Sequence, residues 1–279
     1  MLNNKEIKQL QPKILEIALY FDDFCKKNNL TYYLMGGSAL GAVRHSGFIP
    51  WDDDFDVFMD YHNYSRFINL IDDKIDKKNF YFQAEGSNEW PLYFSKIRMN
   101  DTTYIEKDLT QKKNMHHGIY IDIMCLNNTS QNKFLRYVQY LSARLLSAKA
   151  LTKQNYQTSS IIKKIILFIS KYFISLRTEN FLLNNVRRFN NQDTMLVGHF
   201  FGRAPFKKTS FKKAYLGKQK YVKFENSFLP VPCKVEKYLK VRYGSNFMEI
   251  PSMKERNKYP SHAFIVDIKK SYKEYIEDC

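Results

Sequence analysis

The sequence predicts an α+β fold in which a mixed β-sheet is flanked by helices and followed by a helical and irregular C-terminal half. Three observations lead to this prediction. Helical and strand patterns alternate through the first 130 residues without a regular βαβ repeat. A helical pattern then occupies residues 132–188, and Pro and Gly interrupt the remainder. The 279 residues, 44% hydrophobic, suffice to bury a sizeable core.

The elements of the first 130 residues can be assigned in order from local patterns. Residues 5–28 carry apolar side chains at helical spacing, which predicts an amphipathic helix. "TYYLMGG" is typical of a short buried strand ended by glycine, and "SALGAVRH" of a short helix beginning at Ser38. The turn-rich loop "SGFIPWDD" leads into a strand over "DFDVFMD". After a helical segment at 64–78, strands are predicted at "NFYFQAE", "YFSKIRMN", "TTYIE" and "GIYIDIMCL".

The second half of the chain has a different character. Residues 132–188 are predicted to be helical, and residues 195–279 irregular with short helices such as 235–243. The sequence contains no repeat and no obvious linker. We therefore predict a core at residues 1–130 and a basic helical and irregular region at 131–279 that packs on it.

The charge of the protein is unevenly distributed. The net charge is +16, and residues 131–224 hold 19 Lys and Arg against two acids. The first 130 residues are nearly balanced, and their acids gather near Trp51. A basic flank of this kind suits an anionic partner, namely nucleic acid, an anionic membrane or an anionic substrate.

The lack of a secretory signal and of a spanning helix, together with the spacing of the cysteines, predicts a cytoplasmic protein. The first residues are polar and lack the apolar run of a secretory signal. The most apolar stretch, residues 161–176, is interrupted by three lysines and is shorter than the roughly 20 apolar residues of a spanning helix. The four cysteines are far apart and form no Cys-x-x-Cys pair, so we expect reduced thiols.

The apolar stretch at 161–176 has the pattern of an amphipathic helix. Its isoleucines and aromatic residues share one face, and its lysines and serines lie opposite. This pattern predicts a helix packed on the core with a solvated basic face. The alternative is an interfacial helix in peripheral contact with an anionic membrane, at its inner face.

Carboxylates form the strongest candidate for a functional site. Side chains at i and i+2 of a strand share a face, so "DFDV" places Asp54 beside Asp56. Asp122 is an isolated acid in the apolar strand "GIYIDIMCL", where an unpaired charge would be costly. Adjacent carboxylates repel unless a cation lies between them, and oxygen ligands suit Mg²⁺ or Mn²⁺. We therefore expect Asp54, Asp56 and Asp122 to hold a metal ion.

Glycines and cations supply candidates for binding a phosphate. At a strand-to-helix turn, Gly36 and Gly37 allow a ligand to approach the backbone, and Ser38 opens a helix whose positive end attracts phosphate. Arg44 and His45 follow on the same helix. Two further cations of "SKIRMN", Lys96 and Arg98, share a strand face and could reach a phosphate or lie on a solvated surface.

This arrangement resembles the nucleotidyltransferase superfamily, and within it the LicD family. "GGSALGAVRHSGFIPWDDDFDV", the strand "GIYIDIMCL" and the tail "LPVPCKVEKYLKVRYGSNFMEIP" are similar to that family's signatures. The turn "YGSN" departs from it, because an acidic residue commonly follows the glycine there. Arg256 and His262 also resemble family positions, without an assigned role.

The resemblance implies a phosphotransferase with a nucleotidyltransferase-like core. Such an enzyme moves phosphocholine or a polyol phosphate from a CDP-activated donor to a sugar hydroxyl of a cell-surface glycan such as lipopolysaccharide, teichoic acid or capsule, which can be lipid-linked. Metal held by the three aspartates would bridge the pyrophosphate and neutralise charge on the leaving nucleotide. Asp122 could also take the proton from the acceptor hydroxyl.

Two other functions remain open at this point. The same core serves nucleotidyl transfer to RNA or to a small molecule, although the basic region lies apart from the carboxylates and no common RNA-binding module is present, so no nucleic acid is expected as a partner. The chain could also be a non-catalytic basic membrane-binding protein. The presence of all three carboxylates argues against this.

Overall fold

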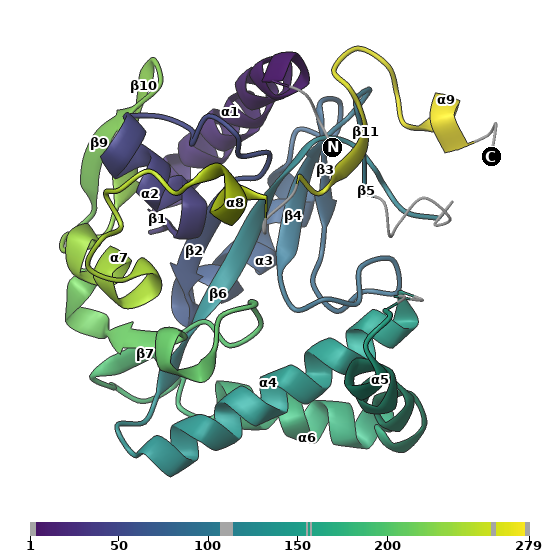
Figure 1. The fold of residues 1–279 in the computed structure, drawn as a ribbon, viewed down its shortest axis with the longest axis vertical. Helices are drawn as coiled ribbons and strands as arrows, with labels where there is room; N and C mark the ends of the chain where they lie inside the picture. Colours follow the sequence, from purple (N-terminus) through teal and green to yellow (C-terminus); the bar gives the residue numbers. More distant parts are fainter. Residues whose placement is uncertain (1–3, 107–113, 155, 157, 258–260, 277–279) are drawn as a thin grey trace.

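A mixed β-sheet forms the centre of the computed structural model, which describes residues 4–106, 114–154, 156, 158–257 and 261–276 (Figure 1). The strand order is β1-β2-β6-β4-β3, and β7 and β8 extend the sheet beyond β6. Strands β2 and β6 are parallel, whereas β4 is antiparallel to β6. The elements up to β6 are α1 (Asn4–Lys27), β1 (Tyr33–Leu34), α2 (Gly36–His45), β2 (Asp56–Asp60), α3 (Tyr61–Lys74), β3 (Phe80–Gln83), β4 (Ser95–Met99), β5 (Thr103–Glu106) and β6 (Tyr120–Thr129).

The second half begins with three helices that form a separate layer at the bottom of Figure 1. Their small core contains Leu146, Val186 and Phe200. The chain then returns to the sheet. The remaining elements are α4 (Lys133–Lys153), α5 (Ile161–Phe173), α6 (Leu176–Arg187), β7 (Leu196–Gly198), β8 (Ser210–Lys212), β9 (Lys220–Phe224), β10 (Ser227–Val231), α7 (Val235–Tyr243), α8 (Met253–Arg256), β11 (Ala263–Asp267) and α9 (Lys273–Ile276), with short 3-10 turns at Phe206–Lys208 and Lys213–Tyr215.

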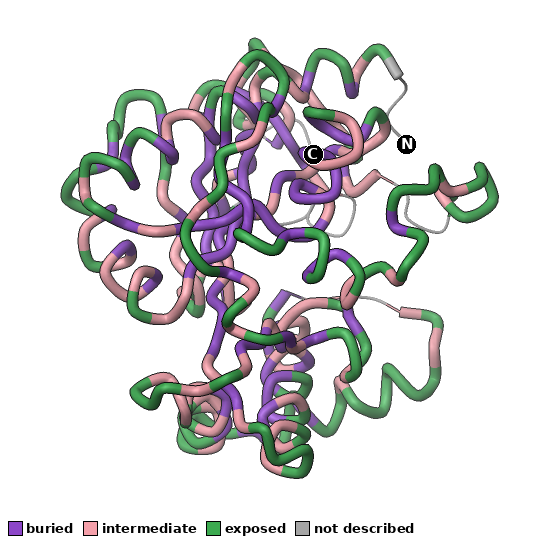
Figure 2. Tube along the Cα trace, turned by 90° about the vertical axis from the view of Figure 1, so that its left-hand side faces the viewer, coloured by how far each residue is buried: buried purple, intermediate pink, exposed green. Residues whose placement is uncertain are grey.

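The main hydrophobic core lies between the sheet and the helices α1 and α3. Helix α1 buries a stripe that includes Leu10, Ile14 and Phe21, and α3 contributes Phe67. Figure 2 shows the buried segments concentrated at the central strands. The predicted α+β class, a mixed sheet flanked by helices, is confirmed.

The register of the sheet places three charged residues in one row. Asp56 of β2 lies opposite Asp122 of β6, and Lys96 of β4 lies opposite Asp122 on the other side. Residues that are directly paired across a sheet present their side chains on the same face. The fold therefore brings together residues that are far apart in sequence.

Two predicted boundaries near the glycines and aspartates are wrong. Helix α2 begins at Gly36 rather than Ser38, because the Ser38 hydroxyl accepts a hydrogen bond from the Asp56 amide at 2.8 Å instead of capping the helix. Strand β2 begins at Asp56, so Asp54 precedes the strand. Asp54 lies outside the strand, but burial still alternates there: Asp54 and Asp56 are half-buried and Phe55 between them is buried.

The tail is more regular than its sequence predicts. Strand β7 pairs with β6, and β11 returns to pair with β5. Such short strands are stabilised by partners distant in sequence, which local patterns do not reveal. Cys25, Cys125 and Cys233 are free thiols, as expected, whereas Cys279 lies outside the described residues.

Helix α5 contradicts the prediction that it packs its apolar face on the core. Its isoleucines and aromatic side chains are exposed, and Ser170 is its one buried residue among those the structure describes. The helix is joined to α4 by a hydrogen bond from Lys149 to the carbonyl of Lys171. No helix in the described ranges combines the length and the hydrophobicity needed to cross a membrane.

Candidate functional site

The glycine turn after β1 forms one wall of the site. Gly36 has a φ of +57°, which favours glycine, and a Cβ there would lie 2.7 Å from Oδ2 of Asp56. At Gly37 a Cβ would lie 2.7 Å from Oδ2 of Asp52. The Gly36 amide donates to the hydroxyl of Tyr238 at 3.0 Å. Both glycines thus leave room for a carboxylate directly against the backbone.

Helix α2 starts at this turn without a side-chain cap on its first residues. The amides of Gly37 and Ser38 belong to its first turn, where no intrahelical carbonyl can satisfy them. They carry the positive end of the helix dipole and face a region that holds carboxylates. This end of α2 is suited to bind a phosphate that arrives together with a cation.

Three aspartates at alternating positions form a row beside the turn. Asp52, Asp54 and Asp56 are half-buried, whereas the intervening Phe55 belongs to the core. Burial, and then the charges of the neighbouring aspartates, raise the pKa of Asp54 to about 6 and raise the pKa of Asp52 and Asp56 well above the ordinary range. The row therefore concentrates negative charge that the protein alone does not neutralise.

Asp122 lies on the same face and interacts with this row. Its charge contributes to the raised pKa of both Asp54 and Asp56. Lys96 Nζ lies 2.7 Å from Asp122 Oδ1, so the two side chains form an ion pair inside the protein. Burial raises the pKa of Asp122, and Lys96 opposes that increase.

Lys96 and Arg98 do not lie on a solvated strand face, because both are buried. Lys96 is held between Asp122 and aromatic rings, with Nζ 3.2 Å from the centroid of the Tyr120 ring. The Arg98 guanidinium donates to the Gln83 side chain and to the carbonyl of residue 118, each at 2.8 Å. Lys96 is thus part of the carboxylate site. Arg98 instead links β4 to β3 and to the segment before β6.

Arg44 and His45 lie at the far end of α2 and hold neighbouring segments. Arg44 donates to the carbonyls of Phe247 and Glu249 at 3.1 and 2.9 Å, and its Nε contacts His45 Nε2 at 3.0 Å. Burial and then the charges of Arg44 and Arg256 lower the pKa of His45. These contacts fix the chain that follows α7.

The tail completes the site through cations that the sequence reasoning did not assign. The charge of Arg242, on α7, lowers the pKa of Asp56, and that of His262 lowers the pKa of Asp54. The Arg256 guanidinium stacks on the ring of Trp51, 3.8 Å from its centroid. Arg242 thus lies close enough to the carboxylates to offset part of their charge, and it could have been proposed from its place in the family-like tail.

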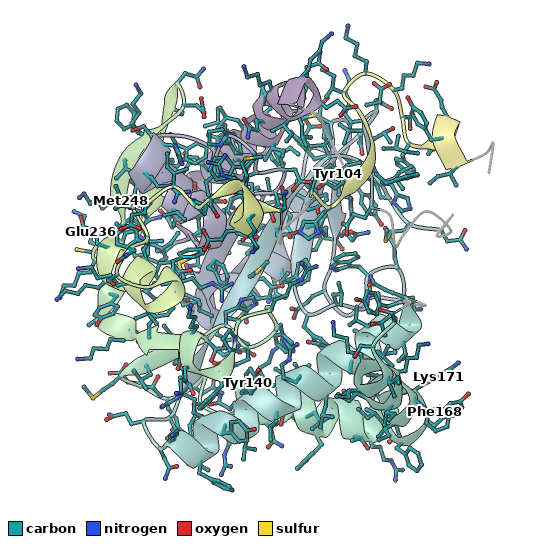
Figure 3. The ribbon with its side chains drawn as sticks, in the orientation of Figure 1. Tyr104, Tyr140, Phe168, Lys171, Glu236 and Met248 are labelled. Atoms are coloured by element: carbon teal, nitrogen blue, oxygen red, sulfur yellow. The ribbon has the colours of Figure 1, made fainter. Side chains whose placement is uncertain are left out.

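Asp52 and Asp53 were also missed as site residues. The alternation that selects Asp54 and Asp56 extends back to Asp52, and this pattern was the available signal. Asp53 faces the other way, where its Oδ2 accepts hydrogen bonds from Tyr104, Ser261 and the amides of His262 and Ala263. Figure 3 shows Tyr104 beside β11, the strand that this carboxylate anchors.

We expect Asp53→Ala to destabilise the protein by about 3 kcal/mol, because several donors around a buried carboxylate lose their acceptor. Urea denaturation of the purified protein measures this loss. Asp193→Ala, at an exposed surface position, is the matched control and should change stability by less than about 0.5 kcal/mol. Equal stability of the two variants would show that Asp53 does not anchor the tail.

The carboxylates offer oxygen ligands of the kind that Mg²⁺ prefers, although no group of three His, Cys, Asp or Glu side chains in the described ranges is already arranged to hold a metal ion. Two observations nevertheless fit a cation. After burial, repulsion from nearby aspartates raises the pKa of Asp54 and Asp56, and the glycine turn leaves space beside Asp52 and Asp56. The metal site at Asp54, Asp56 and Asp122 stays a prediction.

We expect Asp54→Asn to stabilise the metal-free protein at about pH 8 by roughly 1 to 3 kcal/mol and to have little effect near pH 4. The pKa of Asp54 is about 6 in the folded chain, above its ordinary unfolded value. A carboxyl with a raised folded pKa contributes stability at low pH that is lost as pH rises through that pKa. Urea denaturation at both pH values measures the difference.

The effect of Mg²⁺ on the melting temperature is a second test of the role of Asp54. Mg²⁺ should raise the melting temperature of the wild type more at about pH 8 than at about pH 5, and should raise that of Asp54→Asn less. Asp193→Asn removes an exposed carboxylate and should respond like the wild type. An identical response of all three proteins to Mg²⁺ would contradict metal binding at Asp54.

A mixed sheet whose glycine turn faces a row of carboxylates is the arrangement that the resemblance to nucleotidyltransferases predicts. Residues 29–143 match the family model described as "LicD/FKTN/FKRP, nucleotidyltransferase domain". They span the glycine turn, the aspartate row and the strands that carry Lys96 and Asp122. The match agrees with the LicD-family resemblance predicted from the sequence.

Curated proteins match shorter parts of the chain. The chain is 44% identical over 64 residues to the lipopolysaccharide cholinephosphotransferase LicD of Haemophilus influenzae, covering 23% of this chain and 24% of that protein. It is 42% identical over 45 residues to an uncharacterized protein of Rickettsia typhi and 58% identical over 31 residues to one of Rickettsia prowazekii, covering 16% and 11% of this chain. The matches span 24%, 15% and 12% of the three relatives.

Proposed function

We propose that the protein transfers phosphocholine or a polyol phosphate from a CDP-activated donor to a sugar hydroxyl of a cell-surface glycan. The observation that carries the proposal is the carboxylate row against the glycine turn, inside a LicD-family domain. The row is negative, so it can receive a pyrophosphate only together with a cation. A metal-dependent transferase meets this condition.

Two groups of residues would bind the donor. The amides of Gly37 and Ser38 at the start of α2 can donate to phosphate oxygens. The Arg242 guanidinium and the His262 imidazole lie near Asp56 and Asp54 and can approach the same phosphates. Lys96 is buried and forms an ion pair with Asp122. We therefore expect it to compensate the charge of Asp122 and not to bind the donor.

The proposed chemistry is a direct displacement. The acceptor hydroxyl oxygen forms a bond to the phosphorus that carries the alcohol, and the bond from that phosphorus to the bridging oxygen breaks. CMP leaves with the electron pair, and Asp122 takes the hydroxyl proton. A bound Mg²⁺ or Mn²⁺, held by Asp54, Asp56 and Asp122, would supply charge neutralisation for the phosphates. The raised pKa of Asp122 supports its part as base.

The identities of the transferred group and the acceptor are drawn from the named relative. Because that relative is a lipopolysaccharide cholinephosphotransferase, phosphocholine and lipopolysaccharide are the first substrates to test. Polyol phosphates, and teichoic acid or capsule as acceptors, follow from the wider family resemblance. A soluble nucleotide donor would place the reaction in the cytoplasm, and a lipid-linked acceptor at the inner face of the membrane.

A donor screen tests the function. Purified protein is incubated with Mg²⁺ and CDP-choline, CDP-ribitol or ATP, with an RNA oligonucleotide in parallel reactions. We expect CMP release from a CDP-linked donor, enhanced by an acceptor glycan and lost with EDTA. Incorporation of nucleotide into RNA would instead favour the nucleotidyltransferase alternative, and binding to membranes without any CMP release would favour the non-catalytic one.

A further inference from the structure

Helix α5 turns its apolar face away from the rest of the protein. Its fully buried residue is Ser170, and the carbonyl of Lys171 accepts a hydrogen bond from Lys149 of α4 at 2.8 Å. The large side chains of the opposite face are between 44% and 74% exposed. They are Ile161, Ile162, Ile165, Ile166, Phe168, Ile169, Tyr172 and Phe173.

These side chains form one continuous stripe along the helix. At 100° per residue they occupy adjacent positions on the helical wheel, so they present a single apolar surface rather than scattered exposed residues. Figure 3 shows Phe168 and Lys171 at the outer edge of the molecule, on the side of α5 remote from the sheet. An apolar surface of this kind on a monomer marks a site of interaction.

The charges around the stripe are almost entirely positive. Lys164 and Lys171 lie along one border of the apolar stripe, and Lys163 lies near the other. Between residues 133 and 187 the one acid in the sequence is Glu179, which pairs with Lys153 at 2.9 Å. A binding partner for this surface must therefore have an apolar region that contacts the stripe and negative charges that pair with the lysines.

A second copy of the chain is a poor occupant. If the same face met itself across a two-fold axis, its lysines would meet other lysines without acids to balance them. An anionic bilayer satisfies both demands, because the apolar stripe enters the acyl boundary and the lysines stay among the headgroups. With 13 residues, α5 is too short to span and would lie along the surface.

We infer that α5 is a membrane anchor that lies in the plane of an anionic lipid bilayer, with its isoleucine and aromatic stripe in the lipid and its lysines at the headgroups. The inference does not depend on the proposed reaction, because it rests on a surface far from the carboxylates. The sequence pattern predicted that this apolar stripe packs on the protein core, whereas we infer that it contacts lipid.

Vesicle sedimentation with the full 279-residue chain tests the inference. Vesicles of phosphatidylcholine alone are compared with vesicles in which about one third is phosphatidylglycerol. Wild type should partition at least about tenfold more strongly onto the anionic vesicles. The double variant Ile165→Ser with Ile169→Ser should lose about tenfold or more of this partitioning. Lys164→Glu with Lys171→Glu should lose about fivefold or more per lysine on anionic vesicles.

The matched control is Phe228→Ser, which removes a 63% exposed aromatic side chain from the β9–β10 hairpin and should bind like the wild type. Melting curves check that each variant is folded. Wild-type partitioning of the folded isoleucine variant would overturn the inference. The inference would also be overturned if the wild type bound neither vesicle type and formed dimers that the Ile165→Ser, Ile169→Ser variant does not form. The stripe would then be a self-association interface.

Discussion

Asp56→Asn is expected to lower the rate of CMP release by about three orders of magnitude while the protein stays folded. Asp56 is in register with Asp122, and Gly36 leaves room for its Oδ2, so its carboxylate lies between the glycine turn and Asp122. Asparagine keeps the size of the side chain and removes the charge that holds a cation. Initial rates with the best donor of the screen measure the effect.

The control for this prediction is Asp72→Asn, an exposed carboxylate on α3. It changes the net charge equally and should keep full activity. Melting temperatures establish that the Asp56 variant is not inactive through unfolding. Wild-type turnover of a folded Asp56→Asn would remove the metal site from the proposed reaction.

Lys96→Met is expected to destabilise the protein by about 3 to 5 kcal/mol at neutral pH and to abolish activity. The reason is that Asp122 keeps its buried carboxylate but loses the cation 2.7 Å away. Adding Asp122→Asn removes the uncompensated charge, so the double variant should recover most of the stability and none of the activity. Urea denaturation of the single and double variants completes a double-mutant cycle.

Arg98→Met offers a contrast, because Arg98 makes hydrogen bonds to Gln83 and to a backbone carbonyl instead of pairing with Asp122. Its loss should not be compensated by Asp122→Asn. If Asp122→Asn fails to rescue Lys96→Met, the two residues do not form the coupled pair that the structure indicates.

Local patterns were sufficient to select aspartates that the fold brings together, because these residues follow the period of an extended chain or stand out in an apolar strand. Asp54 and Asp56 were found from their alternation, and Asp122 from its isolation in an apolar strand. What the sequence could not supply was the register that sets Asp122 between Asp56 and Lys96. Strand pairing joins distant segments, and this also explains why β7 and β11 were missed.

The errors around the site have a common physical cause. Ser38 has the residue type of a helix cap, but its hydroxyl has a better partner in the Asp56 amide. Asp52 and Asp53 look alike in sequence, yet one faces the glycine turn and the other the tail. Amphipathicity likewise predicted helix α5 but not what its apolar face meets, since that depends on the placement of the whole helical layer.

We propose that the carboxylate row and the glycine turn bind the nucleotide pyrophosphate through a divalent cation. Calorimetric titration of CDP into the wild type and Asp56→Asn, each with Mg²⁺ and with EDTA, tests it without requiring the identity of the transferred alcohol. We predict binding to the wild type with Mg²⁺, and affinity at least about 100-fold weaker in the other three titrations. CDP affinity that is the same with EDTA, or the same in Asp56→Asn, would show that the pyrophosphate does not bind through a cation held by Asp56.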